Sequence, residues 1–131
     1  MVLTEGGVHE WDILIESNGI LENSPCNVLG AVGDIFSPTT SLCEIDPSWV
    51  LFCTPWNLQV RNSTNGVVNN TGGEPFRKGD VVTFHLDSAT RRGDISVNGT
   101  RYSGVFTELP DQVYPAVTLH PGARYRLRTR A

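Results

Sequence analysis

Lysine and arginine are missing from the first 60 residues, which carry eight carboxylates and therefore a local charge of −8. The remaining residues hold all ten basic side chains and six acidic ones, a balance of +4, so the whole chain carries −4. Binding to a nucleic-acid backbone regardless of its sequence requires a basic domain, so we expect no nucleic-acid partner. The uneven distribution has two interpretations: separate acidic and basic surfaces, or oppositely charged strands that pair within one domain. We favour the second.

Long apolar runs are also missing, because no stretch approaches the ~18–20 apolar residues that a membrane span requires. The opening residues lack the basic start, apolar core and cleavage site of a secretion signal. We therefore expect a cytoplasmic location, with the nucleus as the other compartment, and no membrane association. Cysteine is scarce: Cys26, Cys43 and Cys53 suit neither a disulfide framework nor a zinc site in number or spacing. We expect reduced thiols, no bound metal and no cofactor.

The chain of 131 residues, 39% of them hydrophobic, has the length and composition of one globular domain. No window has apolar residues at helical spacing, whereas apolar and polar residues alternate repeatedly between Gly, Pro, Asn and Asp. In the clearest early segment, Trp11, Ile13 and Ile15 share one face of a strand. The carboxylates of this segment, Glu10, Asp12 and Glu16, share the other face.

Seven to nine such strands, with turn signals about every ten residues, predict an all-β fold: a two-sheet antiparallel β-sandwich or jelly roll. Gly30, inside a short apolar run, indicates a buried strand that another backbone or side chain approaches closely. The Asn98-Gly99 pair predicts a type I′ hairpin turn. Besides the segment with Trp11, we expect strands at 28–32, 49–53, 56–60, 81–87, 95–97, 102–105, 113–119 and 124–130, and 67–68 only suggests a further brief strand.

The order of several motifs resembles that of a SPRY domain. The match runs from Gly7 to Leu127, and the strand that many members carry before its first motif is missing. That loss is consistent with excision from a longer parent chain. The motifs are GVHEWDI at 7–13, VLGAV at 28–32, WNL at 56–58, FRKGDVV at 76–82 with LD at 86–87, ISVNG at 95–99, Phe106 and VYPAV at 113–117.

The resemblance implies that residues 1–131 form one SPRY-like, concanavalin A-like domain that is not an enzyme. It implies a monomeric module that recognises a peptide or loop of a partner protein through loops at one end of the sandwich. Such a module serves as an adaptor that brings a substrate or subunit to a larger assembly, for example a ubiquitin ligase. The expected contact residues are Glu22, Asn23, Phe36, Trp49, His120 and Pro121.

Trp49 is the best single anchor among these residues, because tryptophan is enriched at interface hot spots, but a core position fits it equally well. The alternative function is a galectin-like, carbohydrate-binding jelly roll. Trp56, Asn57 and Arg61 could stack on and hydrogen-bond a sugar, although the His, Asn and Arg set of galectins is not present in order.

Enzymatic interpretations are weaker. Three carboxylates on one strand face resemble those of laminarinase-type glycoside hydrolases, which cleave between paired carboxylates. The last of them, Glu16, comes one residue too late for that pattern, and the chain is too short, so a solvated face is favoured. No nucleophile-elbow or zinc-protease pattern is present, and we expect His85 to be a surface imidazole.

The terminal strand carries arginines at every second position, with Tyr125 and Leu127 on the opposite face. Arginine binds carboxylate and phosphate in a bidentate manner, so one interpretation is a site for anions or acidic peptides. The other, which we favour, is pairing with the carboxylates of Glu10, Asp12 and Glu16 on a neighbouring strand. The arginines concerned are Arg124, Arg126, Arg128 and Arg130.

Overall fold

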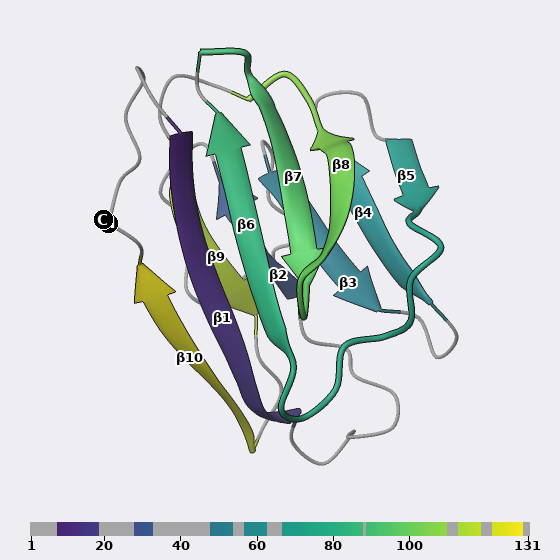
Figure 1. The fold of residues 1–131 in the computed structure, drawn as a ribbon, viewed down its shortest axis with the longest axis vertical. Helices are drawn as coiled ribbons and strands as arrows, with labels where there is room; N and C mark the ends of the chain where they lie inside the picture. Colours follow the sequence, from purple (N-terminus) through teal and green to yellow (C-terminus); the bar gives the residue numbers. More distant parts are fainter. Residues whose placement is uncertain are drawn as a thin grey trace.

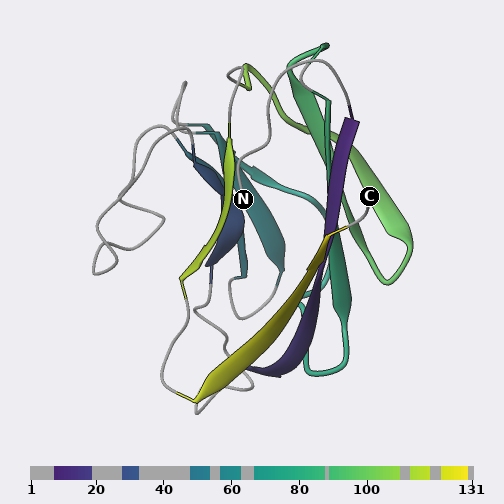
Figure 2. The ribbon, with the colours of Figure 1, turned by 90° about the vertical axis from the view of Figure 1, so that its left-hand side faces the viewer.

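The computed structural model describes residues 8–18, 28–32, 48–53, 57–62, 67–87, 89–109, 113–118 and 122–129. These residues form ten strands in two five-stranded sheets that face each other (Figures 1 and 2). The predicted antiparallel sandwich is therefore confirmed, with ten strands where seven to nine were expected. Within these ranges, no helix is long and apolar enough to cross a membrane.

The first sheet has the order β10-β1-β6-β7-β8, and every neighbouring pair in it is antiparallel. Its strands are β1 (Val8–Asn18), β6 (Val81–Asp87), β7 (Arg92–Val97), β8 (Thr100–Phe106) and β10 (Ala123–Thr129). The second sheet has the order β5-β4-β3-β2-β9 and is antiparallel as well. It contains β2 (Val28–Val32), β3 (Ser48–Cys53), β4 (Leu58–Asn62), β5 (Val67–Asn70) and β9 (Tyr114–Thr118).

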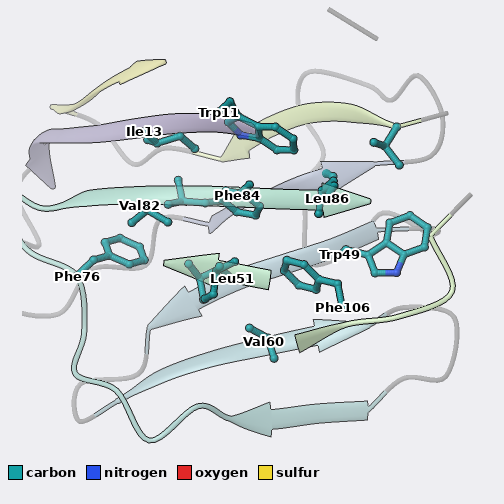
Figure 3. Packing of buried hydrophobic residues seen from close by; sticks show 14 of the residues in the cluster. Trp11, Ile13, Trp49, Leu51, Val60, Phe76, Val82, Phe84, Leu86 and Phe106 are labelled. Carbon is teal, nitrogen blue, oxygen red and sulfur yellow. The ribbon is translucent and has the colours of Figure 1, made fainter. Parts of the chain in front are cut away.

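The core lies between the sheets and follows the predicted alternation of β1. Trp11 and Ile15 are fully buried, and the Trp11 ring stacks on Phe84 with a centroid distance of 5.0 Å (Figure 3). Phe84 in turn stacks on Phe106 at 6.0 Å. This stack connects β1, β6 and β8 in the interior of the sandwich. Aromatic side chains bury large apolar areas, so the stack contributes strongly to the stability of the core.

Gly30 confirms the expected close approach. A β-carbon at this position would collide with the carbonyl oxygen of Trp49 on β3 and would lie 3.0 Å from the Cα of Val50. Only glycine therefore allows β2 and β3 to pair as they do, at Gly30 opposite Val50.

The two turns at one end of the first sheet support each other. Asn98 and Gly99 have φ angles of 51° and 88°, as the predicted type I′ turn between β7 and β8 requires. The side chain of Asn98 accepts a hydrogen bond from the amide of Val81 at 2.9 Å and donates one to Asp80 at 2.9 Å. Asp80 also accepts from the amide of Arg77, so the entry to β6 and the hairpin that follows it are held together.

Strands β9 and β10 each lie at the edge of their sheet. They are on the same side of the sandwich, the side that faces the viewer in Figure 2. Among the described strands, β9 pairs only with β2, and β10 pairs only with β1. Within the described residues, this side of the sandwich therefore has two strand edges without a second neighbour, one from each sheet, and so does the side with β5 and β8.

Candidate partner-binding surface

Trp49 is a core residue. Of the two interpretations of its sequence position, the core position is correct and the exposed anchor is wrong. The side chain lies on β3 and is 1% exposed. Its Nε1 donates a hydrogen bond of 2.8 Å to the carbonyl of Thr107, which follows β8 in the other sheet. Loop proximity in the sequence was misleading, because Trp49 follows the alternation of β3, which directs its ring between the sheets.

The other expected contact residues, Glu22, Asn23, Phe36, His120 and Pro121, lie outside the described residues, as does Trp56 of the carbohydrate-binding alternative. The strands nevertheless define where their segments attach. Asn18 is opposite Ala123, and Val28 is opposite Thr118, so the 19–27 and 119–121 segments start from the same end of the sandwich. The 33–47 segment leaves β2 from its other end, at Val32. The three candidate loops therefore do not attach at one common end.

The arginine strand pairs with the acidic strand, as favoured from the sequence. Arg126 contacts Glu16 at 3.2 Å, and Arg128 contacts Asp12 at 3.1 Å. This pairing joins the acidic first part of the chain to the basic second part. The arginine side chains are 70% and 75% exposed, so most of each guanidinium remains accessible on the outer face of the first sheet.

His85 is not a simple surface imidazole. Its side chain is 10% exposed and lies between Glu10 on β1 and Ser96 on β7. Its Nδ1 contacts the Glu10 carboxylate, and its Nε2 lies 2.8 Å from the Ser96 hydroxyl oxygen. Although this connectivity is that of a catalytic triad, Ser96 is only 8% exposed on a sheet face, so the chain of contacts connects three strands.

Asp12 and Asp94 extend this polar layer on the outer face. Asp12 is 3% exposed and accepts a hydrogen bond of 2.7 Å from the Thr83 hydroxyl. Asp94 accepts from the Gly104 amide at 2.7 Å and pairs with Arg101 at 2.8 Å. Burial opposes ionisation of Asp94, but the Gly104 amide and the Arg101 guanidinium outweigh it, so the pKa of this carboxyl lies below 3.8. The outer carboxylates are therefore engaged in contacts within the fold.

Cys53 at the end of β3 is a partly buried thiol that packs against the core. Burial, with a further contribution from the negative charge of Asp80, raises the pKa of Cys53 to about 12, although the Phe76 amide donates to its sulfur at 3.4 Å. The thiolate is the reactive form, so this thiol is inert at neutral pH. Within the part of the chain that the structure describes, no group of three His, Cys, Asp or Glu side chains could hold a metal ion.

An apolar groove of about 300 Å³ opens between the two edge strands β9 and β10. Trp11 and Ile13 of β1 line it from the interior, while Val117 of β9 and Leu127 of β10 line it from opposite sheets. Sequence reasoning did not find this groove, because Leu127 has the alternation of an inward-facing residue. Its exposure follows from the edge position of β10, which depends on the order of the strands.

The sandwich is similar to three solved SPRY domains. The human HERC1 SPRY domain aligns with a TM-score of 0.67 at 16% identity, over 98% of this chain and 78% of that one. A human SPRY domain gives 0.69 at 16% identity over 96% and 82%, and the TRIM65 PSpry domain gives 0.64 at 16% identity over 100% and 68%. No protein-family profile and no curated protein matches the sequence. The chain therefore has the fold of a SPRY domain.

Proposed function

We propose that this chain is a non-catalytic protein-interaction module that recognises a peptide or loop of a partner protein. The observation that carries the proposal is the likeness to SPRY domains over nearly the whole chain. The polar groups of the outer face agree with it, because Glu10, His85 and Ser96 bond to one another, as do Asp12 and Thr83. These contacts stabilise the sheet. We therefore expect the partner to bind at loops and strand edges, because binding residues of a rigid β fold usually lie there.

The surface we favour includes the end of the sandwich from which the 19–27 and 119–121 segments start. It contains Glu22, Asn23, His120 and Pro121, whereas the segment with Phe36 starts from the opposite end. We further propose a monomeric adaptor in the cytoplasm or nucleus that brings its partner to a larger assembly such as a ubiquitin ligase. The net charge of −4 disfavours a nucleic-acid partner.

Affinity capture from a lysate, followed by binding to the purified candidate, tests this proposal. We expect saturable binding to one protein, reproduced by a short fragment of it. Substitution of Glu22, Asn23 and His120 by Ala should weaken it, whereas Arg92→Glu on β7 should not. A glycan array run in parallel tests the carbohydrate-binding alternative. Saturable glycan binding that is lost in Trp56→Ala, with no protein captured, would overturn the proposal.

A further inference from the structure

We propose that the side of the sandwich formed by β9 and β10 binds an extended segment of the partner as an added strand along β10. The bound segment alternates acidic side chains, which meet the arginines of β10, with apolar side chains that enter the groove. This inference rests on the proposed function in one respect, namely that the ligand is a protein. It assigns the contact to an edge of the first sheet and gives the chemistry of the ligand.

The edge of β10 can accept a strand. Among the described strands β10 has β1 as its only neighbour, and it contains no proline. The Ile15 amide donates a hydrogen bond to the backbone carbonyl of Asp80, next to β6. In an antiparallel ladder every second residue directs its amide and carbonyl to the same neighbouring strand, so those of Ile13 also face β6. Leu127 is opposite Ile13, and its own amide and carbonyl therefore point away from β1 to the open edge. Strand β9 is a poorer template, because Pro115 lacks an amide donor.

The groove beside this edge requires an apolar occupant. Among the described residues the large hydrophobic side chains that are exposed are Val8, Val117 and Leu127, and the last two flank the groove at 40% and 52% exposure. The indole Nε1 of Trp11 is buried without a hydrogen-bond partner among the described residues. Such an orphan donor is rare in proteins.

The arginines define the other face of the ligand. Arg124, Arg126 and Arg128 are exposed on the outer face of β10. The carboxylates of Glu16 and Asp12 neutralise two of them from the β1 side only. Side chains directly opposite on neighbouring strands lie about 4.5–5.5 Å apart at their β-carbons, so acidic residues on an added strand would contact the guanidinium groups. Side chains alternate between the two faces of a strand. A bound segment that alternates acidic and apolar residues would therefore contact the arginines on one face and the groove on the other.

The same charges argue against a second copy of this chain as the occupant. If two β10 edges paired with each other, the arginines of both copies would lie side by side on one face of the joined sheet. Like charges directly opposite across two strands are destabilising. A partner segment of opposite charge is therefore the occupant that fits this edge.

Selection from a displayed library of random nonapeptides tests the inference without a known partner. We expect enriched peptides to alternate Asp or Glu with Val, Ile, Leu or Phe, and a fluorescein-labelled consensus peptide to bind saturably. Arg124→Glu should weaken its binding roughly tenfold. The double variant Val117→Ser with Leu127→Ser should also weaken it roughly tenfold or more. N-methylation of alternate peptide amides should abolish binding if strand pairing is required.

Matched controls separate the edge from general effects. Arg92→Glu makes the same charge change on the outer face of β7, and Val8→Ser removes an exposed apolar side chain away from the groove. Both should bind like the wild type, and thermal unfolding verifies that each variant is folded. The N-methylated peptide distinguishes strand addition from simple apolar docking, because it keeps every side chain.

The outcomes distinguish this inference from the proposed function. If peptides or a captured partner bind equally well to the edge and groove variants, the inference is overturned and the proposed function stands. If the groove variants abolish a concentration-dependent self-association seen by sedimentation velocity, the occupant is a second copy and the inference is also overturned. If neither peptides nor proteins bind saturably, the proposed function fails as well.

Discussion

At the scale of single residues, Trp49 and Cys53 show how strongly burial determines chemistry. Both end up in the sandwich interior or against it, although each lies next to a loop in the sequence. The sequence pattern allowed Trp49 to be either a core residue or an interface anchor. Only the tertiary contact of its indole with Thr107 decides between the two. The exposure of a residue at a strand end depends on tertiary contacts that its neighbours in sequence do not reveal.

Trp49→Ala should lower the free energy of unfolding by about 3–5 kcal/mol, the usual cost of removing a buried aromatic side chain. Trp49→Phe should cost less, because it retains most of the packing and loses mainly the hydrogen bond to Thr107, worth about 1 kcal/mol. Urea unfolding measures both values. At temperatures where the Trp49→Phe variant is folded, its affinity for the partner should equal that of the wild type. A large loss of affinity would indicate that Trp49 contacts the partner after all.

The Cys53 thiol should react slowly with a disulfide reagent in the folded protein at pH 8 and rapidly in urea. The reason is that burial and Asp80 hold its pKa at about 12, so the thiolate is scarce. A chain with Cys26→Ser and Cys43→Ser isolates this thiol for the absorbance measurement. Equal reaction rates in the folded and unfolded chains would contradict the described burial.

At the scale of elements, the sequence predicted the strands well, because alternation and turn residues are local properties. The Trp11, Ile13 and Ile15 face, Gly30 and the Asn98-Gly99 turn all behave as their chemistry requires. The pairing of β1 with β10 was also inferred from charge. The order of all strands within the sheets could not be derived this way, because it depends on contacts between distant segments. The groove and the His85 contacts were therefore missed.

The β1 and β10 ion pairs make a modest contribution that depends on salt. Arg126→Glu should lower the free energy of unfolding by about 1 kcal/mol or less at low ionic strength, since the Arg126 side chain of the pair with Glu16 is 70% exposed. In 1 M salt the effect should shrink because exposed charges are screened. Arg92→Glu on β7 is the matched control in the same urea titrations. An effect that is independent of salt would contradict the assigned pairing.

The link between β7 and β8 through Asp94 should make stability depend on pH in the acid range. The folded pKa of Asp94 lies below its ordinary value of 3.8, so its contribution is present above about pH 4. That contribution is lost as the pH falls through the folded pKa, because the unfolded chain then binds the proton more readily. Urea unfolding between pH 2 and pH 6 should show a smaller loss of stability for Asp94→Asn. An identical acid slope in both proteins would show that Asp94 contributes nothing.

At the scale of the whole molecule, the described strands enclose an interior and leave strand edges on two sides, β9 with β10 and β5 with β8. The aromatic stack fills the space between the sheets, and the polar contacts of the first sheet occupy its outer face. The side with β9 and β10 differs from the side with β5 and β8, because along its two edges the structure shows exposed apolar side chains beside arginines. A rigid frame with such an edge is suited to binding a segment of another protein.

Hydrogen exchange in the complex with a captured partner tests the central claim most directly. We expect slower amide exchange in β10, where a bound strand would occupy the edge at Leu127. Exchange should stay unchanged in β5 and β8, the edge strands on the far side of the two sheets. Protection confined to β5 or β8, with β10 exchanging as in the free protein, would contradict strand addition at β10.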